Sequence, residues 1–211
     1  MCRYATSKYH VTAIIIVLCL VWLSARPLQA AGPVLHVRVY DYAKLAPDTL
    51  KYTEAEADRV LQWAGIQVKW NNCGMIGGCG DPNDLVIRVV GRGTSGWFAR
   101  SVLGFALPSP HGGAATLFYR HAVVAQSHGS FVYLILGRAM AHEIAHLLLG
   151  PASHSPVGVM RPGHAIDEFA GAGTSQWFFT AVEASHMRDD VLRRSEERRG
   201  GTGNISDIPG R

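Results

Sequence analysis

Short stretches in the first half of the sequence have the hydrophobic pattern of β-strands. Residues 34–40 (VLHVRVY) alternate apolar and polar side chains, which predicts a strand with one buried face. Residues 66–70, 85–90 and 114–119 are three further apolar runs of strand length. The interval 91–113 is rich in Gly, Ser and Pro, so we expect it to be mostly loop.

The segment between the first two predicted strands has the apolar spacing of a helix. Pro47 and Asp48 predict its start, with Asp48 or Thr53 as the capping residue, and Gly65 predicts its end. Its apolar stripe is formed by Leu50, Ala57, Val60, Leu61 and Ala64. A strand, a helix and a strand in this order predict a right-handed crossover and parallel pairing.

A second helix is predicted at the start of the stretch 131–162, where strong helix formers are followed by Gly150-Pro151. This helix contains an H-E-x-x-H motif, His142-Glu143-Ile144-Ala145-His146. Because positions i and i+4 of a helix lie on one face, His142 and His146 can present two imidazoles to one metal ion. Glu143 is placed to reach a metal-bound water and to take a proton from it.

A catalytic zinc ion needs a third protein ligand. His154 follows Gly150 by four residues, and Met160 follows His154 by six. With the preceding motif, this pattern resembles that of the metzincin zinc peptidases, H-E-x-x-H-x-x-G-x-x-H followed by a Met-containing turn. The chain has one extra residue before the glycine and one after it, and Arg161 stands where those domains often carry a tyrosine. Ser153-His154-Ser155 resembles the end of the motif in catalytic domains of the matrix-metalloprotease type.

The resemblance implies a Zn²⁺ site and a hydrolytic reaction. Its metal ligands would be His142, His146 and His154. Glu143 would be the general base, and Met160 would belong to the Met turn beneath the metal. The implied activity is that of a zinc-dependent endopeptidase, with a peptide or protein as substrate.

The resemblance also implies a fold, that of a zincin-like α+β domain within the broad α/β class. We expect a twisted mixed sheet of about four strands, an active-site helix and a C-terminal helix, within a catalytic domain of residues 31–194. In metzincins the strand before the active-site helix is an edge strand that pairs with extended substrate. Residues 112–119 would form that strand here.

Several alternatives stay open at this point. The third metal ligand could be a downstream carboxylate, Glu183 or Asp167, or it could be His164, which lies past the Met turn. The two histidines of the motif could also be buried residues that make ordinary hydrogen bonds. In a different functional class, the chain could be a catalytically silent zinc-binding or protein-binding module on a zincin fold.

The C-terminal part of the sequence predicts one more helix. Trp177 is apolar and precedes Thr180 and Glu183, which have capping-box spacing, so a helix over 181–194 is expected, with Trp177 in the core. Residues 195–211 are polar and glycine-rich, and we expect them to form a disordered tail.

The N-terminal residues 1–30 have the pattern of a secretory signal peptide. Arg3 and Lys8 precede an apolar run over 11–23, and Leu28-Gln29-Ala30 offers a cleavage site. We therefore expect a secreted or periplasmic protein, with an uncleaved membrane anchor as the alternative.

The signal peptide changes how charge and cysteine content are interpreted. Without residues 1–30 the chain has 17 basic and 16 acidic residues and no concentrated basic face, which argues against nucleic-acid binding. The two cysteines that remain, Cys73 and Cys79, flank a glycine-rich segment. In an exported protein this spacing predicts one local disulfide, with free thiols as the alternative.

Overall fold

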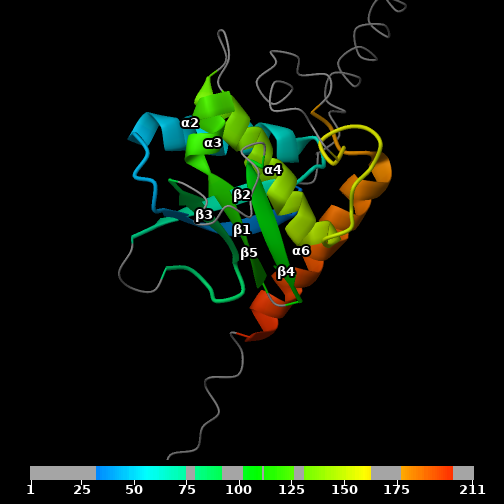
Figure 1. Cartoon of the computed structure of the whole chain (residues 1–211). Helices are drawn as coiled ribbons and strands as arrows, with labels where there is room; N and C mark the ends of the chain where they lie inside the picture. The colour runs from blue at the N-terminus through cyan, green and yellow to red at the C-terminus, as the bar shows by residue number, and fades with distance from the viewer. Residues whose placement is uncertain are drawn as a thin grey trace, which may run out of the picture. The chain divides into compact units, whose positions relative to one another are not determined.

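The computed structural model describes residues 32–74, 79–91, 102–110, 112–125, 131–162 and 177–201, which belong to the compact unit beginning at Gly32. The predicted signal peptide lies outside the described residues. In chain order (Figure 1) the elements are β1 (Val34–Asp41), α2 (Pro47–Gln62), β2 (Gln67–Cys73), β3 (Leu85–Val90), β4 (Gly104–Ser109), β5 (Gly112–Phe118), α3 (Tyr119–Ala125), α4 (Val132–Leu149) and α6 (Ala181–Gly201).

One mixed sheet contains all five described strands, in the order β2-β1-β3-β5-β4. β1 pairs in parallel with β2 and with β3, and β3 pairs in parallel with β5. The parallel pair of β1 and β2, joined through α2, confirms the strand–helix–strand unit that the sequence predicts. The alternating pattern of 34–40 is also confirmed, because Leu35, Val37 and Val39 are buried.

β4 is the strand that the sequence does not predict. It lies within the interval 91–113, so the prediction of mostly loop is wrong at residues 104–109. Gly104 and Pro108 are poor strand formers, and Pro108 is tolerated because β4 lies at the edge of the sheet. β4 pairs antiparallel with β5, which places β5 between β3 and β4. The expectation that residues 112–119 form the edge strand is therefore wrong, and β4 is that edge.

α4 is the most deeply buried helix of the described fold. Of its 18 residues, 13 are buried, and it contacts α2, α6, β4 and β5 (Figure 1). A helix with neighbours on most sides needs apolar residues on most sides. By length and composition alone α4 could cross a membrane, with a mean hydropathy of 1.3, but 72% of it is buried inside the fold. Its hydropathy is thus accounted for by its place in the core.

α2 and α4 approach each other closely at Gly137. A Cβ atom on Gly137 would lie 2.6 Å from Cβ of Glu56 and 2.7 Å from the carbonyl oxygen of Thr53. The next residue, Arg138, is 2% exposed and donates from Nε to Oε1 of Glu56 at 2.9 Å. Its guanidinium lies 4.8 Å from the ring centroid of Trp177, which is fully buried. The core position expected for Trp177 is confirmed.

The carboxylate of Glu56 also accepts hydrogen bonds from a second arginine, Arg59. Arg59 donates to both of its oxygens at 2.7 Å. Burial by itself raises the pKa of Glu56, but the hydrogen bonds from Arg59 and Arg138 outweigh that effect and hold the pKa below its usual value. The α2–α4 contact therefore contains a charged, hydrogen-bonded pair, and removing one partner would leave the other charge buried without compensation.

Two predicted helix starts have different outcomes. The N-cap of α2 is Ala46, with no side-chain cap, so the caps proposed at Asp48 and Thr53 are wrong; the Thr53 hydroxyl donates to the carbonyl of Thr49 instead. Pro47 follows this N-cap and presets a helical φ there, as proline at a first helical position does. The capping box of α6 is confirmed, because Thr180 N donates to Glu183 at 2.7 Å.

The far end of α6 is held by the turn that precedes β3. The predicted disulfide between Cys73 and Cys79 is present, and the chain then reaches Asp84. The carboxylate of Asp84 accepts hydrogen bonds from Arg198 and from the backbone N–H of Asp81. Helix α6 runs to Gly201, so the prediction of a tail from 195 is wrong for residues 195–201, while 202–211 lie outside the described residues.

The close approach of α2 and α4 predicts a large cost for a small substitution. Gly137→Ala adds a Cβ at less than 3 Å from Glu56 and Thr53, so it should lower the free energy of unfolding by about 1–3 kcal/mol. Chemical denaturation measures this. Gly200→Ala is the matched control, because a Cβ on Gly200 meets nothing within 4 Å. If the two variants are equally stable, the packing described here is wrong.

Candidate metal centre

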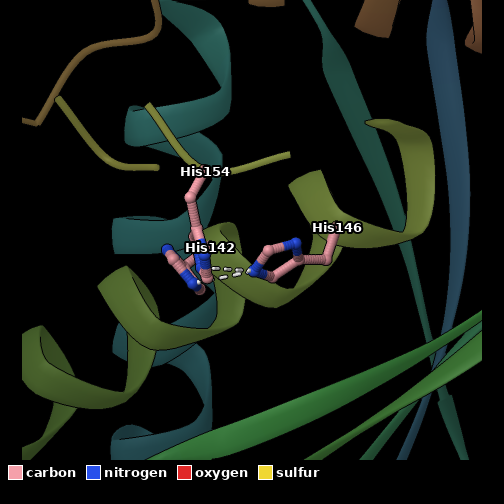
Figure 2. A group of neighbouring side chains, drawn as sticks. All are labelled: His142, His146 and His154. Atoms are coloured by element: carbon pink, nitrogen blue, oxygen red, sulfur yellow. Dashed lines mark hydrogen bonds between the residues drawn. The ribbon is translucent and has the colours of Figure 1, made fainter. Parts of the chain in front are cut away.

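α4 and the segment after it bring the three predicted zinc ligands together. His142 and His146 lie one turn apart on α4, whose C-cap residue is Gly150, where φ is 97° and a glycine is favoured. Nε2 of His146 lies 3.1 Å from Nε2 of His142 and 3.2 Å from Nε2 of His154. Figure 2 shows the three rings pointing toward one another.

The opposite nitrogen of two of these rings is fixed by a hydrogen bond. Nδ1 of His142 lies 2.8 Å from the carbonyl oxygen of Val159, which can only accept, so Nδ1 carries the proton. Nδ1 of His146 faces Ser153 Oγ at 3.1 Å and the carbonyl oxygen of Gly150 at 3.3 Å. Ser153 Oγ donates its only hydrogen to Gly150 at 2.6 Å, so His146 must also donate from Nδ1.

A cation resolves the electrostatic problem that this arrangement creates. When both rings are neutral with their protons on Nδ1, His142 and His146 turn two Nε2 lone pairs toward each other at 3.1 Å. Two such acceptors repel unless a positive charge lies between them. Tetrahedral zinc with nitrogen ligands separates those nitrogens by about 3.3 Å. The separations of 3.1 Å and 3.2 Å between Nε2 of His146 and those of His142 and His154 therefore fit Zn²⁺.

The protonation state of His146 is also the one that a metal requires. Burial lowers its pKa, and the neighbouring His154 lowers it further, against the opposing effect of the hydrogen bond to Gly150. A metal ligand must be the neutral imidazole, because only that form offers a lone pair. The surroundings of His146 thus favour the form that can bind.

Glu143 follows His142 on α4 and is 7% exposed. Burial raises the pKa of its carboxyl to about 8. Gly104 of β4 lies against it: a Cβ atom there would be 3.1 Å from Cγ of Glu143. The edge strand therefore passes directly beside the side chain expected to act as base. The sequence did not predict that Gly104 lies beside Glu143; the signal for this strand is the apolar run 102–107 (VLGFAL), which Gly104 interrupts.

The turn that contains Met160 adjoins the same histidines. Met160 and Val159 are fully buried. The backbone N–H of Ser155 donates to the carbonyl of Met160 at 2.9 Å, and that of Val159 donates to Phe178 at 2.9 Å. Because the carbonyl of Val159 accepts the hydrogen bond from His142, this turn helps to orient a candidate metal ligand.

The structure does not bring any of the alternative third ligands into the histidine group within the described residues. Glu183 caps α6 through Thr180 and does not belong to the histidine group. Asp167 and His164 lie outside the described residues. In the part of the chain that the structure describes, His142, His146 and His154 are the only metal-ligating side chains that gather in a group of three or more, with ligand atoms within 4.8 Å of one another.

Comparisons with known proteins agree with this architecture. No protein-family model matches the sequence, and the curated proteins give no match. Among solved structures, a zinc-dependent peptidase from Methanocorpusculum labreanum is 15% identical, with a TM-score of 0.50 over 72% of this chain and 99% of that one. Archaemetzincin from Methanopyrus kandleri is 12% identical, with a TM-score of 0.50 over 80% and 99%. At these identities the likeness shows the fold, which is that of zincin-like peptidases.

The convergence of the three histidines predicts that His154 is needed for tight zinc binding. His154→Ala removes one of three converging nitrogens, so zinc affinity should fall by more than about a hundredfold, beyond the loss typical of an outer-shell change. Competition with a coloured chelator measures this. His121→Ala is the control, because His121 bonds to the carbonyl of Val102 outside the group and should keep full affinity. Full zinc binding by His154→Ala would remove His154 from the ligand set.

Proposed function

We propose that the chain is a zinc-dependent endopeptidase, a metzincin-like enzyme of the matrix-metalloprotease type, with His142, His146 and His154 as zinc ligands and Glu143 as general base. The observation that carries the proposal is the convergence of three imidazole Nε2 atoms, with the buried carboxyl group of Glu143 next to His142 in sequence. The zincin-like fold, seen in solved structures of zinc-dependent peptidases, supports it.

In this proposal each residue has a defined task. Zinc, when bound, polarises the scissile carbonyl and lowers the pKa of water. The Nδ1 hydrogen bonds of His142 and His146 hold both rings with Nε2 directed inward. Glu143 accepts the proton of the attacking water and gives it to the departing amine nitrogen. Burial raises the pKa of Glu143 to about 8, and the positive charge of a bound zinc ion would favour the carboxylate that this task needs.

A peptide substrate is supported by the edge of the sheet. On the side away from β5, no described strand covers β4. Such an edge can pair with an extended peptide through backbone hydrogen bonds, which select little for the peptide's side chains. Because Gly104 of β4 lies against Glu143, a peptide along this edge would pass close to the base.

The general-base role predicts that chemistry and metal binding can be separated. Glu143→Ala leaves the three imidazoles in place, so zinc should stay bound at the parent's affinity. Peptide cleavage should nevertheless fall by about a hundredfold to ten-thousandfold, the usual contribution of a positioned general base. Both quantities are measured on the same preparation, with a broad peptide mixture as substrate.

The outcome also separates the enzyme from a silent binding module. A parent protein that binds zinc but cleaves no peptide supports the module and contradicts the peptidase. A Glu143→Ala variant that cleaves as fast as the parent contradicts the role of Glu143.

Export belongs to the same proposal. The pattern of residues 1–30 and the disulfide between Cys73 and Cys79 support a secreted or periplasmic protein, because disulfides persist in oxidising compartments. N-terminal sequencing of the exported protein should give a chain that starts at Ala31. A chain that retains Met1 would favour a membrane anchor.

A further inference from the structure

The connection between the second and third histidines is longer here than in the metzincin pattern, and one side chain spans it. Gly150 ends α4 and His154 joins the metal group, so the chain must reverse within a few residues. Ser153 lies inside this reversal and is partly buried. Its hydroxyl contacts both a ligand ring and the backbone at the end of the helix.

The hydroxyl of Ser153 has a direction that its neighbours impose. Its oxygen lies 2.6 Å from the carbonyl oxygen of Gly150, which can only accept a hydrogen bond. A hydroxyl has one hydrogen, and this contact uses it. Toward Nδ1 of His146, at 3.1 Å, Ser153 therefore offers a lone pair. His146 is left with its proton on Nδ1 and its lone pair on Nε2, the atom that faces the other two rings.

The same hydrogen bond also restrains the backbone beside His154. Ser153 immediately precedes His154, and its bond to Gly150 ties that part of the turn to the last carbonyls of α4. Carbonyls at a helix C-terminus lack intrahelical partners, so this one gains a donor. One hydroxyl thus orients the ring of His146 and anchors the residue next to the third histidine.

We infer that Ser153 is a positioning residue of the metal centre, which fixes the tautomer and orientation of His146 and the approach of His154. The inference rests on the proposed function in one respect, that the three histidines bind zinc. An outer-shell partner of a ligating histidine typically changes metal affinity by 10–100-fold. The carbonyl of Gly150, at 3.3 Å, remains a weaker acceptor for His146 when Ser153 is removed. The expected effect is therefore about tenfold.

The matched control lies on the other side of His154. Ser155 is in the same turn, and its hydroxyl donates to the carbonyl of Val157 at 2.8 Å rather than contacting a metal-group histidine. Ser155→Ala removes the same atom from the same segment. Ser153→Thr keeps the hydroxyl and serves as the rescue variant.

The experiment measures zinc affinity of the full chain by chelator competition in the parent and the three variants. Peptide cleavage and the unfolding midpoint of the chelator-treated protein are recorded on the same samples. Ser153→Ala should bind zinc about tenfold more weakly, whereas Ser155→Ala and Ser153→Thr should stay within about twofold of the parent. In Co²⁺-loaded protein, the visible spectrum of Ser153→Ala should also differ from that of the parent, because the ligand orientation changes.

Three results would overturn the inference. Ser153→Ala could bind zinc as tightly as the parent, Ser155→Ala could lose as much affinity, or the affinity loss could be matched by an equal loss of stability in the chelator-treated protein. A parent that binds zinc without cleaving peptides contradicts the peptidase alone and leaves the role of Ser153 intact. A parent that binds no zinc contradicts both.

Discussion

The packing of α2 against α4 at Gly137 is the contact on which the rest of the site depends. α4 carries His142, Glu143 and His146, so any movement of this helix moves the candidate metal centre. The helices can approach only because Gly137 has no side chain, and the ion pair between Arg138 and Glu56 adds directional bonds to that contact. α4 packs between the sheet, α6 and α2. This packing fixes the position of the three polar side chains that α4 carries.

Helix α4 shows a conflict between burial and chemistry. Its apolar residues fill the core, yet the same helix must carry two imidazoles and a carboxyl group at partly or fully buried positions. Burial raises the pKa of Glu143 to about 8 and lowers the pKa of His146, so it disfavours the charged form of both groups. For His146 the neutral form is the useful one. For Glu143 a nearby cation would restore the carboxylate, which links the base to the metal site.

The sequence predicted those parts of the fold that local patterns determine. Three such predictions were confirmed: the strand at 34–40, the helix after Pro47 and the H-E-x-x-H helix. In each, burial on one face or on all sides determines the spacing of apolar residues along the sequence. β4 was missed because Gly104 and Pro108 obscure its strand pattern, and their tolerance follows from a place at the sheet edge that no local pattern reveals. The same reason made the assignment of residues 112–119 as edge strand wrong.

The site shows the same division between local and non-local information. Helical periodicity fixed His142 and His146 on one face, and the resemblance to metzincins supplied His154 despite the altered spacing. The hydrogen bonds that orient those rings come from Val159 and Gly150 carbonyls and from Ser153, and backbone carbonyls have no identity in a sequence. The two extra residues around Gly150 lengthen the connection between α4 and His154. A longer connection has slightly more conformations to lose, and the Ser153 hydroxyl adds an internal bond to Gly150 at the point where it also contacts the candidate ligand His146.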